Sequence, residues 1–269
     1  MAGQVSKKEL DAVLMQAMLA AKNLRSQRDR LLQLGRRLQQ LSPGDDDKVR
    51  VQNLASNIFD VYYIGIEAGG RMLATCLELA VKNGARFPIN AAFATMPDEQ
   101  LYNVLLAQRL PARPTTQAEA FSRVEACFYA VKLSQEHHLP RCMEHLTGVY
   151  PAVVPVETSD DRSEDEDGPV AAVTDHLAKT DLSDPAAAAA GATDEPPQPE
   201  TRSSAVDFVK ARDFLDRGCT ILSLAVKHID LAVAVLSRFM DPKEAASLSE
   251  FTDSVAYISE DGPYPASDD

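Results

Sequence analysis

The chain has 269 residues and a formal net charge of −13 at pH 7; 45% of its residues are hydrophobic and none is tryptophan. This hydrophobic content is typical of globular proteins and too high for a fully disordered chain. No uninterrupted apolar run reaches the roughly 18 residues of a membrane-spanning helix, and no apolar stretch follows a basic start as in a signal peptide. We therefore expect a protein of the nucleus or cytoplasm without a membrane partner.

The acidity is concentrated in two segments. Residues 157–203 contain thirteen Asp and Glu against three Lys and Arg, and the tail 259–269 contains four acidic residues and no basic one. The segment 151–203 is also rich in proline and alanine and has no periodic apolar face, so it cannot bury enough surface to offset its ordering entropy. We predict that it is a disordered acidic linker.

The N-terminal part reads as a series of long amphipathic helices. Ser6 and Glu9 have the spacing of a capping box, and an apolar period then continues to Leu38. A second helix after Asp45–Asp47 is interrupted by Gly65, Gly69 and Gly70, which indicates close helix packing or a kink rather than a phosphate loop. Its expected apolar face consists of Val51, Leu54, Ile58, Val61, Ala68, Met72, Cys76 and Leu79.

Two further helices are expected before the linker. Pro97 opens the first of them. Thr116 and Glu119 form a second capping box, and the helix that they open is predicted to stop before Pro140.

The most regular helix follows the linker. The segment 204–207, which ends at Asp207, is expected to cap its N-terminus. Apolar residues then recur at spacings of three and four. This seam consists of Phe208, Ala211, Leu215, Gly218, Leu222, Ala225, Ile229, Ala232, Leu236 and Phe239. Because isolated helices draw their stability from packing, the seam must dock, either on the N-terminal helices or on a partner chain; the first is favoured. We select Leu222, Ile229 and Leu236 as its contact residues.

Together these features predict an all-α protein, a long-helix bundle interrupted by a disordered acidic linker. The expected division is a helical bundle over 6–150, the linker over 151–203, C-terminal helices over 204–258 that dock on the bundle, and an acidic tail over 259–269.

One short cluster contains metal-ligand residue types. His138, Cys142 and His145 lie within the segment 137–145, but a closed zinc site needs about four ligands and no Cys-x-x-Cys accompanies them. Histidines at a helix C-terminus also interact favourably with the helix dipole. We expect no metal and no cofactor, and keep a zinc-binding or metal-dependent enzyme as an alternative.

The start of the linker carries a motif. Val153, Val154 and Val156 precede Glu157, Thr158, Ser159 and two aspartates, which resembles a SUMO-interacting motif. Such a segment can add as a strand to the edge of a partner's sheet while its acids face a basic rim. Thr158 and Ser163 precede acidic residues and resemble casein-kinase-type phosphorylation sites.

The first helix is basic, with eight Lys and Arg against three Asp and Glu. Nucleic-acid binding through it is an alternative, although the acidity of the whole chain opposes it. The sequence contains no motif that argues for an enzyme. We therefore expect a non-enzymatic helical scaffold or adaptor subunit of a multiprotein assembly, which binds other subunits through helix seams and linker motifs; the specific form that we expect is a nuclear regulatory assembly.

Overall fold

The protein is described from a computed structural model, which covers residues 5–41, 48–108, 113–148 and 207–260. Within these ranges the chain is helical and contains no strand, so the predicted all-α fold class is confirmed. The linker motif and its phosphorylation candidates lie outside the described residues.

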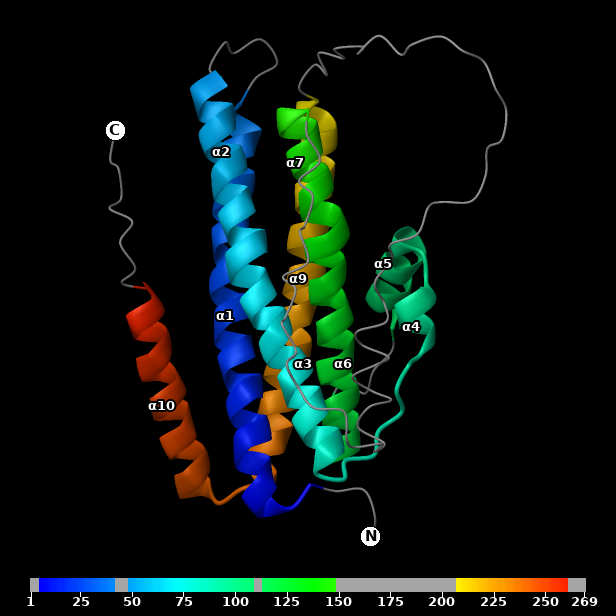
Figure 1. Cartoon of the computed structure of the whole chain (residues 1–269), viewed down its shortest axis with the longest axis vertical. Helices are drawn as coiled ribbons and strands as arrows, with labels where there is room; N and C mark the ends of the chain where they lie inside the picture. Colours follow the sequence, from blue (N-terminus) through cyan, green and yellow to red (C-terminus); the bar gives the residue numbers. More distant parts are fainter. Residues whose placement is uncertain (1–4, 42–47, 109–112, 149–206, 261–269) are drawn as a thin grey trace, which may run out of the picture.

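Four long helical rods form the body of the molecule (Figure 1). The first is α1 and the last is α9; the two between them each consist of two α-helices joined by a π-helical segment. Their bounds are α1 Lys7–Gln40, α2 Lys48–Asp60 with η1 Val61–Ile66 and α3 Glu67–Lys82, α6 Gln117–Leu133 with η2 Ser134–His138 and α7 Leu139–Thr147, and α9 Phe208–Leu236. Smaller elements are α4 Ala92–Thr95, α5 Asp98–Ala107, η3 Ser237–Phe239 and α10 Pro242–Glu260.

The rods run alternately up and down and form a closed ring. α1 packs against α3 and α9, while α6 packs against α3 and α9 from the opposite corner. Each rod therefore neighbours the rods next to it in sequence, and the ring closes between α1 and α9. This is the up-down-up-down arrangement of a four-helix bundle. α5 and α10 lie outside the ring (Figure 1).

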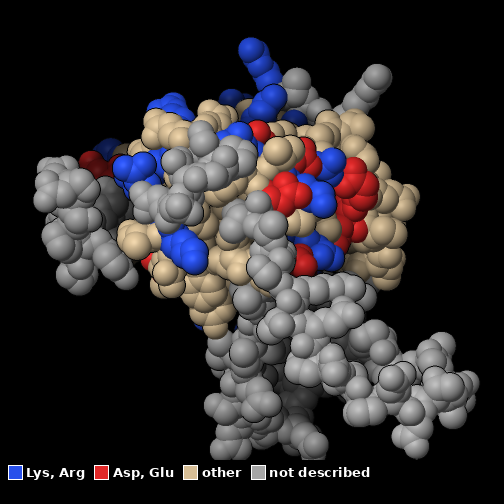
Figure 2. All heavy atoms as spheres, turned by 90° about the horizontal axis from the view of Figure 1, so that it is seen from above, with Lys and Arg blue, Asp and Glu red and all other residues tan. Residues whose placement is uncertain are grey.

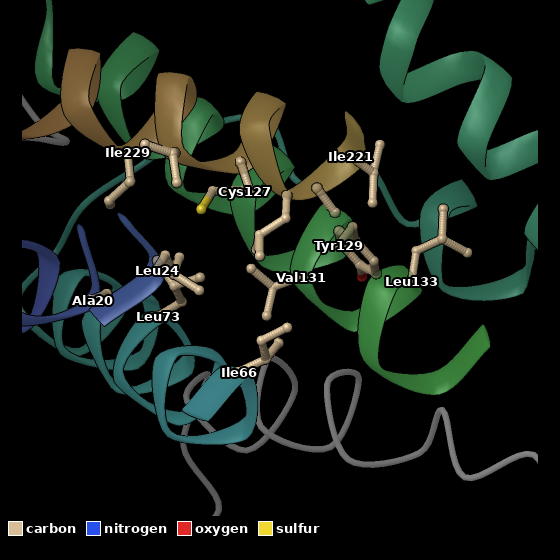
Figure 3. Packing of buried hydrophobic residues seen from close by; sticks show 14 of the residues in the cluster. Ala20, Leu24, Ile66, Leu73, Cys127, Tyr129, Val131, Leu133, Ile221 and Ile229 are labelled. Atoms are coloured by element: carbon tan, nitrogen blue, oxygen red, sulfur yellow. The ribbon is translucent and has the colours of Figure 1, made fainter. Parts of the chain in front are cut away.

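The core is one continuous apolar cluster. Figure 3 shows Leu24 of α1, Leu73 of α3, Val131 of α6 and Ile229 of α9 turned toward one another across the bundle axis. Because each fully buried aliphatic side chain contributes about 1.5–3 kcal/mol, this shared cluster is the main source of stability.

α9 is the most enclosed rod. It packs against α1, α6 and α7, and its N-terminus is capped by the Asp207 side chain, which accepts a hydrogen bond from the Lys210 amide at 3.1 Å. Among the described residues, the stretch Phe208–Phe239 has the length and the apolar composition of a helix that could cross a membrane. In this fold it is a core helix.

Arg212 of α9 also closes the C-terminus of α1. Its guanidinium donates to the carbonyl oxygens of Leu38 at 3.1 Å and of Leu41 at 2.6 Å. The last carbonyls of a helix have no partner within the helix, so this side chain satisfies them and joins the two rods at one end of the bundle.

The glycines of the second rod allow a close approach to α1, as the sequence indicated. A methyl group added at Gly69 would lie 2.7 Å from Leu24 Cδ2 and 2.8 Å from Asn23 Oδ1, and one at Gly65 would overlap the Gln27 side chain. Gly70 differs, because the nearest atom to a methyl there would be Val131 Cγ1 at an ordinary 3.5 Å.

The π-helical segments correct two expectations. In η1 the fully buried Val61 and Ile66 are five residues apart, so the inward face moves to Gly69 and Leu73, while Ala68 and Met72 are only half-buried. The prediction that the helix after Thr116 stops before Pro140 is also wrong. η2 widens the turn just before the proline, which lacks an amide hydrogen, and the rod continues to Thr147.

The two predicted capping boxes have different outcomes. The Thr116 hydroxyl accepts from the Glu119 amide at 3.2 Å and the Glu119 carboxylate accepts from the Thr116 amide, which confirms that box. At the first helix the Ser6 side chain caps no amide; its hydroxyl instead donates to the Glu9 carboxylate at 2.6 Å, so that box is wrong.

The glycine contacts predict a difference between two neighbouring substitutions. Gly69→Ala should lower the free energy of unfolding by roughly 1–3 kcal/mol, because the fully buried Leu24 has no room to move away. Gly70→Ala should leave it unchanged or raise it by up to about 1 kcal/mol, since alanine favours the helix. Urea denaturation followed by circular dichroism measures both; equal effects of the two variants would contradict the close approach at Gly69.

Candidate functional site

A group of charged and aromatic side chains lies where α5 meets η2 and α9. His137 Nδ1 lies 2.9 Å from Asp98 Oδ2, and Arg217 Nη1 donates to Glu99 Oε2 at 2.6 Å. The Arg217 guanidinium also lies over the Tyr102 ring, 5.5 Å from its centre. These contacts attach α5 to the outside of the bundle.

His138, Cys142 and His145 do not form a metal site. His138 is buried with its ring edge-on to Tyr102, Cys142 is fully buried, and His145 stacks on Phe214 with ring centres 5.6 Å apart. No group of three or more His, Cys, Asp or Glu side chains within the described ranges has the arrangement to hold a metal ion.

Burial fixes the protonation of these groups. Desolvation, with His137 and Arg217 nearby, lowers the pKa of His138 to about 3, so its imidazole is neutral at physiological pH. Burial raises the pKa of the Cys142 thiol above its ordinary value, as it does for the other three cysteines. Protonated, enclosed thiols are poor nucleophiles and poor metal ligands.

A second polar group lies inside the ring between α6 and α9. Arg123 Nη1 and His228 Nδ1 are 3.0 Å apart, and both residues are almost completely buried. Because arginine can only donate, His228 Nδ1 is the acceptor and the neutral imidazole carries its proton on Nε2. Desolvation, together with Arg123 and Lys227, lowers the pKa of His228 to about 4.

Glu125 is a buried carboxyl group two residues after Arg123 on α6. Its Oε1 accepts a hydrogen bond from the Asn90 amide at 2.8 Å, which joins the loop before α4 to the bundle. Burial raises its pKa to about 7, and the hydrogen bond from Asn90 opposes that rise. The carboxyl group therefore titrates near neutral pH.

The three selected seam residues belong to the core of this chain. Leu222, Ile229 and Leu236 are each 0% exposed. A partner cannot reach these side chains while the bundle is closed. The proposed linker contacts Val153, Val154 and Val156, and the phosphorylation candidates Thr158 and Ser163, lie outside the described residues.

Three of the eight basic side chains of α1 form ion pairs in the part of the chain that the structure describes. Arg25 forms a double hydrogen bond with Asp230 of α9, and Lys22 contacts the Asp253 carboxylate of α10 at 3.3 Å. Arg28 bonds its neighbour Asp29 at 2.8 Å. At the end of the bundle where α1 finishes, Figure 2 shows Lys and Arg side by side with Asp and Glu on the visible part. This mixed surface differs from the continuous basic stripe that nucleic acid requires.

An open groove of about 440 Å³ lies between α1 and the second rod. Its lining includes Gln16 of α1, Tyr63 and Ile64 of η1, and Ala68, Arg71 and Met72 of α3. Ile64 is 62% exposed, and Tyr63 is held by stacking on Phe59 with ring centres 5.0 Å apart. The polar members of the lining are Gln16, Glu67, Arg71 and Thr75, so the groove combines apolar and polar side chains.

Sequence reasoning did not find this groove. It placed Ala68 and Met72 on the inward face and gave Ile64 no role. The groove results from the register change in η1, which moves these residues away from the inward face. A regular helical period does not include such a change, so the sequence pattern gave no signal of the groove.

Comparison of the chain with protein-family models, with curated proteins and with solved structures found no match. Any functional assignment therefore depends on the residues themselves.

The titration of Glu125 predicts a pH-dependent effect. A carboxyl group whose folded pKa lies above its unfolded value destabilises the fold progressively as pH rises from about 4.5 to about 7. Glu125→Gln keeps an acceptor for Asn90 but carries no charge. Relative to wild type, its free energy of unfolding should rise with pH across that window by on the order of 2 kcal/mol and stay constant above it. Thermal unfolding at a series of pH values tests this, and a pH-independent difference would contradict it.

The contacts of Arg217 predict its role in holding α5. Arg217→Ala removes the Glu99 bond and the cover over Tyr102, so amide hydrogen exchange in Asp98–Ala107 should accelerate by about two- to ten-fold. Lys210→Ala, which removes an exposed ion pair with Asp207 on the same helix, is the matched control and should leave that exchange unchanged.

Proposed function

We propose that this chain is a non-enzymatic helical scaffold or adaptor subunit that binds a partner protein through the groove between α1 and the second rod. One observation carries the proposal: Ile64 is 62% exposed at the edge of an open groove whose other members include Tyr63, Ala68 and Met72. Contiguous apolar surface of this kind is retained where another molecule covers it.

The chemistry of the other polar groups supports the same proposal. His137 is engaged with Asp98, His138 and His228 are buried and neutral, and the cysteine thiols are enclosed. These side chains serve the packing of the bundle and of α5. The linker motif resembling a SUMO-interacting segment and the acidic linker as a whole would then provide a second contact to the same or another subunit.

We place the proposed assembly in the nucleus or cytoplasm, as expected from the sequence. A bundle with one apolar groove and a long acidic linker fits a subunit that brings two partners together, because the linker fixes how far apart they can be.

Ile64→Asp tests the proposal in the full chain. A buried carboxylate at the centre of an apolar contact costs several kcal/mol, so proteins bound at the groove should be lost by at least ten-fold when the tagged chain is purified gently and quantified by mass spectrometry. Val49→Asp is the matched control, because Val49 is 66% exposed on the same rod and does not line the groove.

Circular dichroism should show that both variants retain the wild-type helix content. The same set of partners on wild type, Val49→Asp and Ile64→Asp would contradict the proposal.

A further inference from the structure

α10 is a helix attached to the outside of the ring. It runs beside α1 (Figure 1) and packs against α1 and η3. Lys22 of α1 donates to the Asp253 carbonyl oxygen at 3.0 Å, and Thr252 is buried against the bundle at 4% exposure. The side of α10 that faces the bundle therefore combines the polar Thr252 with the partly buried Ala245 and Leu248.

Two apolar side chains of α10 are exposed instead. Phe251 is 52% exposed and Val255 is 37% exposed. They are four residues apart and so lie next to each other on one side of the helix. We call this pair the α10 ridge. An exposed phenylalanine and valine side by side form an apolar surface that a monomer leaves in water.

The ridge and the groove lie at the same height along the bundle. The Lys22–Asp253 contact places the ridge beside the middle of α1. The close approach of Gly69 to Leu24 and Asn23 places the centre of the groove beside that same part of α1. Gln16 at the groove and Lys22 at α10 are about 120° apart around α1, so the two features occupy neighbouring sides of one helix.

This arrangement is self-complementary under a two-fold rotation. A two-fold axis parallel to the bundle, placed between two copies that lie side by side, leaves the height of both features unchanged and exchanges the two flanks of α1, so the ridge of one copy can meet the groove of the other, and the reverse contact forms at the same time. Features at different heights would not meet in this way.

The charges beside the two features are also complementary. Of the Glu67–Arg71 ion pair at the groove, the arginine side chain is 66% exposed and the glutamate 25%, so the cation is the accessible member. The described part of α10 carries Glu244, Glu250 and Asp253 against the single cation Lys243, and Glu250 directly precedes Phe251. The ridge is thus acidic where the groove presents a guanidinium.

We propose that the partner that occupies the groove is a second copy of this chain, with the α10 ridge of each copy inserted between Tyr63, Ile64 and Met72 of the other. This inference rests on the proposed function, since it names the occupant of the same groove. Because each contact is made twice, the symmetric dimer doubles the area buried by one ridge.

Site-specific cross-linking tests the arrangement. Phe251→Cys and Ile64→Cys copies with different tags are expressed together, purified as full chains and treated with a short bifunctional maleimide. The four native cysteines are all buried, so the introduced thiols are the accessible ones. A cross-linked product that carries both tags is expected.

The matched control pairs Phe251→Cys with Val49→Cys, which is as exposed as Ile64 and lies outside the groove. The mixed-tag product should be at least ten-fold less abundant. Equal cross-linking in the two mixtures would overturn the ridge-in-groove contact. Light scattering of the wild-type chain should give twice the monomer mass at micromolar concentration, and Phe251→Asp should return it to the monomer; a monomeric wild type would also overturn the proposal.

These outcomes are separable from the test of the proposed function. If wild type is monomeric while Ile64→Asp still loses its co-purifying proteins, the groove binds another protein and the dimer proposal fails alone. If the mixed-tag cross-link forms while Ile64→Asp retains those proteins, the dimer stands and the proposed binding of a different subunit at the groove fails.

Discussion

The structure depends on the burial of α9. Its apolar surface covers more than one side, because Leu215, Leu222, Ile229 and Leu236 form the seam while Ile221 and Val226 widen it. A single neighbouring helix covers one stripe only, so α1, α6 and α7 must all pack around it. That requirement closes the ring between the first and last rods. It also explains why the most regular apolar pattern in the chain is inaccessible to a partner in this fold.

The shape of the outer surface follows from two local departures from regular helix. Gly65 and Gly69 bring the second rod close to α1, and η1 rotates the following residues by one position. Ile64 is consequently left exposed at a groove, while Met72 lines the groove and also packs against the core. Because this groove is open and lies beside the exposed α10 ridge, both features are accessible to another protein chain.

The histidine–cysteine cluster illustrates why residue type and spacing do not suffice for a site. His138, Cys142 and His145 share one helix face, but the first and last are about 10 Å apart along the axis, whereas zinc ligands lie about 2 Å from one ion. Ligands from another helix would have to converge on them. The neighbouring elements instead supply Tyr102 and Phe214, which use the imidazoles as packing surfaces.

The sequence by itself determined the helical fold class, the Thr116 capping box and the Asp207 cap, because each depends on residues within a few turns of one another. Only the tertiary structure decided that the seam is internal, that the rod passes through Pro140 and that Ile64 and Phe251 are exposed. Those outcomes depend on which helix lies opposite each residue. A π-helical turn changes that relation for every residue after it, while leaving the amino-acid pattern unchanged.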